Sequence, residues 1–129
     1  MIKFGYTILY VKDVERSIAF YEKAFGLKRK FVAGDAYGEL DTGATTLSFA
    51  SIPQAQSNLK SEIQISSVKG KPFGIEIGFT TDDVEGTYQK AVAAGATEEA
   101  KASDKPHGQT VAYVRDPDGF LVEICTPMA

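Results

Sequence analysis

The first half of the chain carries a helical pattern between two residues that favour helix ends. Asp13 is a good N-cap because its carboxylate can accept hydrogen bonds from the first turn, and Gly26 suits the C-terminal end. The apolar residues between them recur at spacings of four, three and four, which predicts one face of a helix. They are Val14, Ile18, Tyr21 and Phe25.

The same pattern recurs seventy residues further along the chain. Asp13-Val14-Glu15 returns as Asp83-Val84-Glu85, and the second helical pattern closes at Gly95. We expect Asp82 and Glu85, three positions apart, to form a capping box at its start. Internal similarity at a fixed offset indicates two copies of one structural unit. The apolar face of the second helix consists of Val84, Tyr88, Ala91 and Val92.

Each helical pattern follows one strand-like run and precedes three more. Turn residues separate these runs, and the strongest turn is Asp116-Pro117-Asp118-Gly119, with proline second and glycine last. The order of one strand, one helix and three strands therefore occurs twice and predicts an α+β fold. The predicted strands are Tyr6–Val11, Lys28–Ala33, Tyr37–Asp41, Thr45–Ser51, Ile75–Thr80, Glu98–Ala102, Gln109–Arg115 and Phe120–Cys125.

A polar connection, Ile52–Pro72, joins the two repeats. A connection of this length is either a flexible linker or a loop over a site. Neither repeat has enough helix to cover its sheet alone, so we expect a single domain over residues 1–129. Within it, module one spans about residues 1–52, the connecting loop about 53–72 and module two about 73–129.

Composition and charge narrow the classes of function. The 129 residues are 43% hydrophobic and 24% charged, which is typical of a globular domain. The 14 basic and 17 acidic residues give a net charge of −3 without a basic stripe, so we expect neither nucleic acid nor a membrane as partner. The single cysteine, Cys125, excludes a disulfide framework. Because we find neither a signal-peptide pattern nor an apolar run near the ~20 residues of a membrane helix, we expect a cytoplasmic protein.

Four segments of the chain together resemble the vicinal oxygen chelate superfamily, which includes glyoxalase I, bleomycin-resistance proteins and extradiol dioxygenases. They are Tyr6–Asp13, Ser17–Tyr21 and Phe25–Leu27 at the start, and Val114–Ile124 near the end. The resemblance implies two βαβββ modules that form an open, cup-shaped mixed sheet with helices on the outside, commonly in a homodimer. Members of the superfamily differ in activity, so the resemblance does not fix the function.

In the metal-using members, four side chains from the first and last strand of each module point into the cup. The resemblance places these positions at Tyr6, Ser48, Glu76 and Glu123. Strand alternation agrees, because both glutamates alternate with apolar neighbours that suit the helix-covered face. A phenol and a hydroxyl are poor ligands for the metals of such sites, which favour imidazole or three good donors. We therefore expect no cofactor, and a divalent metal, if present, would bind Glu76 and Glu123.

Without a metal, Glu76 and Glu123 would repel each other in a shared cup. Either one carboxyl stays protonated and hydrogen-bonds its neighbour, Tyr6 or Ser48, or the cup receives a cationic ligand. Such a ligand could lie against aromatic rings, which favour cations on their faces. The tyrosines that could supply those rings are Tyr6, Tyr10, Tyr37 and Tyr113.

Two further residues have chemistry that bears on a site. His107 is the only histidine and falls in the loop Lys105–Gly108, which the resemblance places near the mouth of the cup. Cys125 is expected to be a small buried residue, since no partner that would lower its pKa is near it in the sequence. We assign no catalytic residue. The candidate ligand-binding residues are Tyr6, Tyr10, Ser48, Glu76, His107, Tyr113 and Glu123.

Three hypotheses of function remain open at this level. The favoured one is a metal-independent protein that binds a small molecule and sequesters a cationic or aromatic compound. The second is a divergent lyase or isomerase of the glyoxalase I type, with a hard divalent ion on Glu76 and Glu123 and a proton moved by one of them. The third is an accessory module that dimerises without binding a ligand. Stabilisation by a ligand without metal would favour the first, metal-dependent turnover the second, and no response the third.

Overall fold

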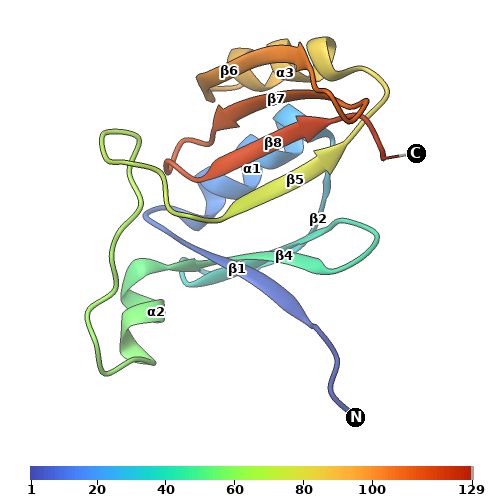
Figure 1. Cartoon of the computed structure of the whole chain (residues 1–129). Helices are drawn as coiled ribbons and strands as arrows, with labels where there is room; N and C mark the ends of the chain where they lie inside the picture. The colour runs from blue at the N-terminus through green and yellow to red at the C-terminus, as the bar shows by residue number, and fades with distance from the viewer. Residues whose placement is uncertain (129) are drawn as a thin grey trace. The chain divides into compact units, whose positions relative to one another are not determined.

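The computed structural model describes residues 1–128 and shows two compact units, Met1–Ile65 and the residues from Ser66 onward. Each unit contains one four-stranded mixed sheet, and each sheet belongs to one βαβββ module (Figure 1). The predicted α+β fold with two such modules is confirmed. Every predicted strand is present, and no strand end differs from its predicted position by more than two residues.

The first unit contains module one and a short helix. The strand order is β1-β4-β3-β2, in which β1 and β4 are parallel and the other neighbours antiparallel. This order arises because α1 carries the chain to the far edge of the sheet, from which three strands return toward β1. The elements are β1 (Tyr6–Val11), α1 (Val14–Phe25), β2 (Lys28–Ala33), β3 (Tyr37–Asp41), β4 (Thr46–Ser51) and α2 (Ile52–Ser57).

Helix α1 forms as the sequence predicts. The Asp13 carboxylate accepts a hydrogen bond from the backbone N–H of Arg16 at 3.1 Å. Gly26 follows the last turn with φ of 69°, a backbone conformation that favours glycine. The buried face, which includes Ile18 and Tyr21, packs on β2, β3 and β4, and this burial stabilises a helix of only 12 residues. No helix within residues 1–128 is long and apolar enough to cross a membrane.

The second unit repeats this arrangement in module two. The strand order is β5-β8-β7-β6, with β5 and β8 parallel and the other neighbours antiparallel. Helix α3 packs on β6, β7 and β8 through buried residues that include Tyr88. The elements are β5 (Glu76–Thr80), α3 (Val84–Ala93), β6 (Thr97–Asp104), β7 (Thr110–Arg115) and β8 (Leu121–Cys125).

The predicted capping box of Asp82 and Glu85 is wrong, because α3 begins one residue later than that box requires. Asp83 is the N-cap instead, and its carboxylate accepts a hydrogen bond from the backbone N–H of Gly86 at 2.9 Å. The Glu85 side chain does not reach back to the cap, since it accepts a hydrogen bond from Gln89 along the helix at 3.0 Å. Both modules therefore begin their helix in the same way, with an aspartate directly before a valine.

The connection between the modules contains a helix that the sequence pattern did not predict. Ser51 caps α2 by accepting a hydrogen bond from the backbone N–H of Gln54 at 3.2 Å. Pro53 lies in the first turn, where its missing N–H costs no hydrogen bond. Gln56, near the end of α2, holds the chain that follows the helix. Its side chain donates to the Ser61 carbonyl at 2.8 Å and accepts a hydrogen bond from the backbone N–H of Ile63 at 3.0 Å. The start of the connection is therefore fixed by hydrogen bonds within the first unit.

The end of the connection is held by a buried arginine of module two. The Arg115 guanidinium donates to the carbonyl of Ser67 at 2.9 Å and to that of Val68 at 3.2 Å. Its third bond, from Nε, reaches the Gly119 carbonyl at 3.0 Å in the turn between β7 and β8. One side chain thus joins two segments that lie nearly fifty residues apart in the sequence.

Candidate functional site

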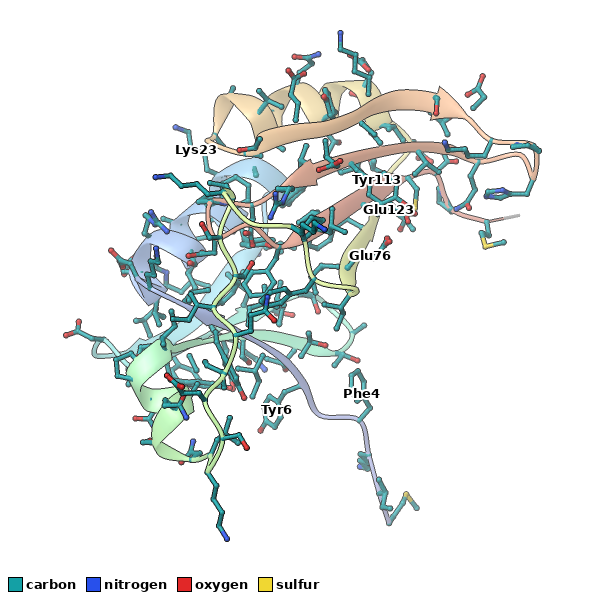
Figure 2. All side chains as sticks on the ribbon, turned by 60° about the vertical axis from the view of Figure 1, so that its left-hand side comes forward. Phe4, Tyr6, Lys23, Glu76, Tyr113 and Glu123 are labelled. Atoms are coloured by element: carbon teal, nitrogen blue, oxygen red, sulfur yellow. The ribbon has the colours of Figure 1, made fainter. Side chains whose placement is uncertain are left out.

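The strand register of module two brings three of the candidate residues to one sheet face. Glu123 on β8 is paired with Gly78 on β5 and with Tyr113 on β7. Glu76 lies two residues before Gly78, and alternate residues of a strand point to the same side. The opposite face carries the buried Val122 and its apolar neighbours beneath α3. Figure 2 shows Glu76, Tyr113 and Glu123 on the strands of this unit.

Glu76 and Glu123 form a hydrogen-bonded pair of carboxyl groups. Two carboxyl groups can bond in this way only when one of them carries a proton. The hydrogen bond to Glu123, followed by burial and by the negative charge of Glu123, raises the pKa of Glu76 to about 7. The same hydrogen bond lowers the pKa of Glu123. Glu76 is therefore the proton donor of the pair, and Glu123 carries the negative charge.

Tyr113 and Cys125 complete the surroundings of the Glu123 carboxylate. The Tyr113 hydroxyl donates to Glu123 Oε1 at 2.9 Å. The Cys125 thiol donates to the Phe79 carbonyl at 3.7 Å and lies near the Glu123 carboxylate. Burial and the acceptor Glu123 raise the pKa of Tyr113 to about 12 and that of Cys125 to about 11. Both groups are therefore neutral near pH 7, and the negative charge of Glu123 is solvated by neutral donors.

His107 does not join this group of hydrogen-bonded side chains. It lies exposed between β6 and β7, and its Nε2 is 2.6 Å from Gln109 Oε1. The attraction between His107 and the Glu123 carboxylate is the smallest of the causes that lower the pKa of Glu123. Its predicted contact with a ligand stays a prediction.

Module one presents a corresponding face built on hydroxyl groups. Ser48 on β4 is paired with Ile8 on β1 and with Glu39 on β3. The Tyr37 hydroxyl lies 2.7 Å from Glu39 Oε2 and 2.9 Å from Ser48 Oγ. A carboxylate can only accept, so the phenol donates to Glu39 and Ser48 donates to the phenol. Burial raises the pKa of Tyr37. The Ser48 hydroxyl is also buried, and its hydrogen is used in the bond to Tyr37.

The other two candidates of module one lie on the same face as Ser48. Tyr6 is 55% exposed and Tyr10 is half-buried. Phe31, which the sequence did not single out, lies beside Tyr37 with their ring centres 6.0 Å apart. Glu39 is a second residue that sequence reasoning missed as part of this face. Alternation along β3 contained the signal, because Tyr37 and Glu39 are two positions apart and therefore point to the same side.

The donor set of the four family positions does not fit a metal centre. Tyr6 precedes by two residues the partner of Ser48, just as Glu76 precedes by two the partner of Glu123, so the positions correspond in register. They supply a phenol, a hydroxyl that already donates to Tyr37, and two carboxyl groups that share a proton. Over residues 1–128, no three His, Cys, Asp or Glu side chains gather closely enough to surround an ion.

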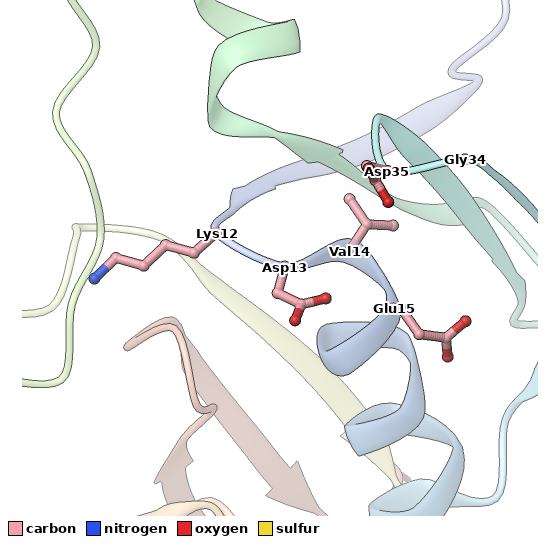
Figure 3. Close-up of a pocket in the computed structure, with 6 residues that line it drawn as sticks. All are labelled: Lys12, Asp13, Val14, Glu15, Gly34 and Asp35. Atoms are coloured by element: carbon pink, nitrogen blue, oxygen red, sulfur yellow. The ribbon is translucent and has the colours of Figure 1, made fainter.

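A pocket of about 340 Å³ lies elsewhere in the first unit, between the start of α1 and the turn after β2 (Figure 3). Two of the three carboxylates in its lining already have structural partners. Asp13 caps α1, and Glu15 accepts a hydrogen bond from Arg29 at 2.7 Å. We therefore assign this pocket no function. Its lining residues are Lys12, Asp13, Val14, Glu15, Gly34 and Asp35.

Comparison with known proteins places this architecture among described families. The model of the Glyoxalase/Bleomycin resistance protein/Dioxygenase superfamily matches residues 3–124. A lactoylglutathione lyase of Schizosaccharomyces pombe is 26% identical over 95% of this chain, which spans only 46% of that relative. A probable lactoylglutathione lyase of Vibrio parahaemolyticus is 28% identical over 92% of this chain and 86% of its own length. The crystal structure of a glyoxalase-related enzyme from Fulvimarina pelagi has the same fold, with a TM-score of 0.85 at 22% identity over 98% of this chain and 89% of that one.

Proposed function

Since the chain belongs to the Glyoxalase/Bleomycin resistance protein/Dioxygenase superfamily, we propose that it binds a cationic small molecule without the help of a metal. The observation that carries this proposal is the Glu123 carboxylate, whose bonded neighbours Tyr113 and Glu76 are both neutral below pH 7. A carboxylate in partly buried surroundings gains from an opposite charge more than an exposed one does. A protonated amine or a related organic cation would supply that charge.

The ligand would meet Glu123 first, because Glu76 is the neutral member of the pair. An incoming cation lowers the pKa of a neighbouring carboxyl group, so its binding would favour release of the proton held by Glu76. Tyr113 would hold the Glu123 carboxylate in position through its hydroxyl group. The predicted contacts of Tyr6, Tyr10 and Ser48 belong to module one and stay predictions.

The test compares two probes that share a ring system and differ in charge. We expect 9-aminoacridine, a planar aromatic cation at pH 8, to bind at least tenfold more tightly than neutral acridine, as measured by fluorescence titration. The double variant Glu76→Gln/Glu123→Gln should abolish this preference, because it removes both carboxyl groups and keeps their shape, whereas Glu123→Gln alone would let Glu76 ionise in its place. Glu85→Gln is the matched control, since it removes one carboxylate from the exposed side of α3. Equal affinity for both probes, or unchanged affinity in the double variant, would refute the proposal.

A second candidate function is a metal-dependent lyase of the glyoxalase I type. The observation that favours it is that relatives named as lactoylglutathione lyases match more than nine-tenths of this chain. The donor set of the four family positions argues against it. Elemental mass spectrometry on protein purified without tag or chelator decides between the two functions. A stoichiometric ion that Glu76→Gln and Glu123→Gln both remove, with turnover that depends on it, would favour the lyase.

We also propose that the protein is a cytoplasmic homodimer, on the strength of its family. Light scattering coupled to gel filtration measures the mass directly. A dimer that responds to none of the probes or ions would instead favour the accessory-module hypothesis.

A further inference from the structure

Within residues 1–128, two glycines lie inside strands, Gly38 in β3 and Gly78 in β5. Glycine weakens a strand, because it has no side chain to pack and gains more freedom on unfolding. Each of these glycines therefore needs a physical reason. Gly38 has one, since a Cβ atom there would collide with Ile18 Cδ1 and would lie 3.2 Å from Val14 Cγ1. The close packing of α1 on the sheet requires a glycine at that position.

Gly78 has no such reason. No atom lies within 4 Å of the position that its Cβ would occupy, so packing does not exclude a side chain. Its φ is not positive, so the backbone does not require glycine either. The residue is exposed in the middle of a strand, where a β-branched or aromatic residue would be favoured.

The space over Gly78 adjoins the charged member of the carboxyl pair. Gly78 and Glu123 are register partners on neighbouring strands, which lie about 4.8 Å apart in a sheet. Along β5, Glu76 and Thr80 flank Gly78 on the same face. On the far side of Glu123, the paired residue is Tyr113, whose hydroxyl already bonds the carboxylate. On the β5 side Glu76 reaches Glu123, but the position over Gly78 is left open, whereas the β7 side is occupied by Tyr113.

We propose that Gly78 is a specificity-determining residue, because the space it leaves lets the charged group of a bulky ligand reach Glu123. This inference rests on the proposed function and adds the route of approach to it. The ligand class that benefits is an amine attached directly to a rigid ring system, since its charge cannot reach a recessed carboxylate without room for the ring. A larger side chain at position 78 would occupy that room and leave the carboxyl groups themselves unchanged.

The experiment uses Gly78→Ala and Gly78→Val in the full chain, with Thr80→Val as the matched control. Thr80 points to the same face two register pairs further along, and valine has nearly its shape. Thermal unfolding first establishes that each variant is folded. Two readouts follow, the affinity for 9-aminoacridine and the rate at which a water-soluble carbodiimide with glycine ethyl ester labels Glu123, mapped by peptide mass spectrometry.

We expect Gly78→Val to lower the 9-aminoacridine affinity and the Glu123 labelling rate at least tenfold, with Gly78→Ala between it and the wild type. Thr80→Val should match the wild type in both. Wild-type affinity and labelling in a folded Gly78→Val variant would overturn the inference. If the wild type does not bind 9-aminoacridine, the proposed function fails, and labelling alone decides whether position 78 controls access to Glu123. Gly78→Ala gives the same decision if the valine variant does not fold.

Discussion

Glu76 on β5 donates the hydrogen bond that joins its carboxyl group to Glu123 on β8, so the two acids hold one proton between them. Below pH 7 the face of module two therefore carries one negative charge from this pair, and the second charge develops as Glu76 titrates around pH 7. That relationship makes both stability and ligand binding depend on pH in a predictable direction.

The first prediction concerns the pH dependence of stability. The pKa of Glu76 is raised from 4.5 to about 7 in the folded protein, so its stabilising contribution is complete below pH 4.5 and is lost as pH rises through 7. Glu123 acts in the opposite sense, because its pKa is lowered and its contribution is lost as pH falls below 4.5. We expect Tm to decline between pH 5 and 8, and Glu76→Gln to flatten that decline. Parallel Tm profiles for the variant and the wild type would contradict the shared proton, and Glu85→Gln serves as the control.

Arg115 provides a prediction about the end of the connection. Its guanidinium is buried and donates to three backbone carbonyl groups, those of Ser67, Val68 and Gly119. Lysine cannot reach all three from one nitrogen atom, and buried acceptors left without donors are costly. We expect Arg115→Lys to lower the free energy of unfolding by about 2–3 kcal/mol in urea denaturation.

The control for that variant is an arginine with exposed partners. Arg29 pairs with Glu15 and Glu22 on the surface of α1. Exposed ion pairs contribute little, so Arg29→Lys should cost less than about 1 kcal/mol. Equal losses in the two variants would show that the bonds of Arg115 to the carbonyl groups do not stabilise the fold.

The two strand glycines should respond differently to the same change. Gly38→Ala places a methyl group against Ile18 beneath α1, and overpacking of this kind costs about 1–3 kcal/mol. Gly78→Ala adds a methyl group in open space and should leave the free energy of unfolding unchanged or raise it slightly. Denaturant unfolding of both variants tests the contrast, which would fail if Gly78→Ala were the more destabilised of the two.

Cys125 should be an unreactive thiol in the folded protein. Burial, with the nearby Glu123 carboxylate, raises the pKa of its thiol from 9.0 to about 11, which lowers the thiolate fraction roughly a hundredfold near neutral pH. We expect its reaction with dithionitrobenzoate at pH 7.5 to be at least a hundredfold slower in native protein than in urea. A native rate close to the unfolded one would show that the carboxylate and burial do not protect the thiol.

The helices show where sequence patterns succeed and where they fail. α1 has a periodic apolar face between two strong end residues, so both its span and its cap are predictable. α2 has six residues and a single buried one, Ala55, which is too short for a period to appear. The cap of α3 depends on which of two adjacent aspartates turns toward the first free N–H groups. Local sequence does not distinguish Asp82 from Asp83, although comparison with Asp13 in module one does.

In the candidate site too, local sequence predicts which way a side chain points but not which residues it bonds. Alternation along β5 and β8 predicts that Glu76 and Glu123 point to one side of the sheet, and the register places them so. The partners within each face depend on pairing between strands that are distant in sequence. For that reason the bonds that join Tyr37 to Glu39 and Ser48 were not predicted, and a protonated carboxyl was only one of two alternatives. The ligand contacts of the seven candidate residues remain predictions.

The correspondence between the two modules is what a tandem gene duplication would leave behind. Both copies have kept the aspartate and valine that begin the helix, whereas equivalent face positions have diverged from a serine in one copy to a glutamate in the other. The residues that begin the two helices are therefore alike, whereas the residues at equivalent positions of the sheet faces opposite the helices differ. Ser48→Glu would give module one a carboxyl group at the position that Glu123 occupies in module two, and so would test whether one module can take on the chemistry of the other.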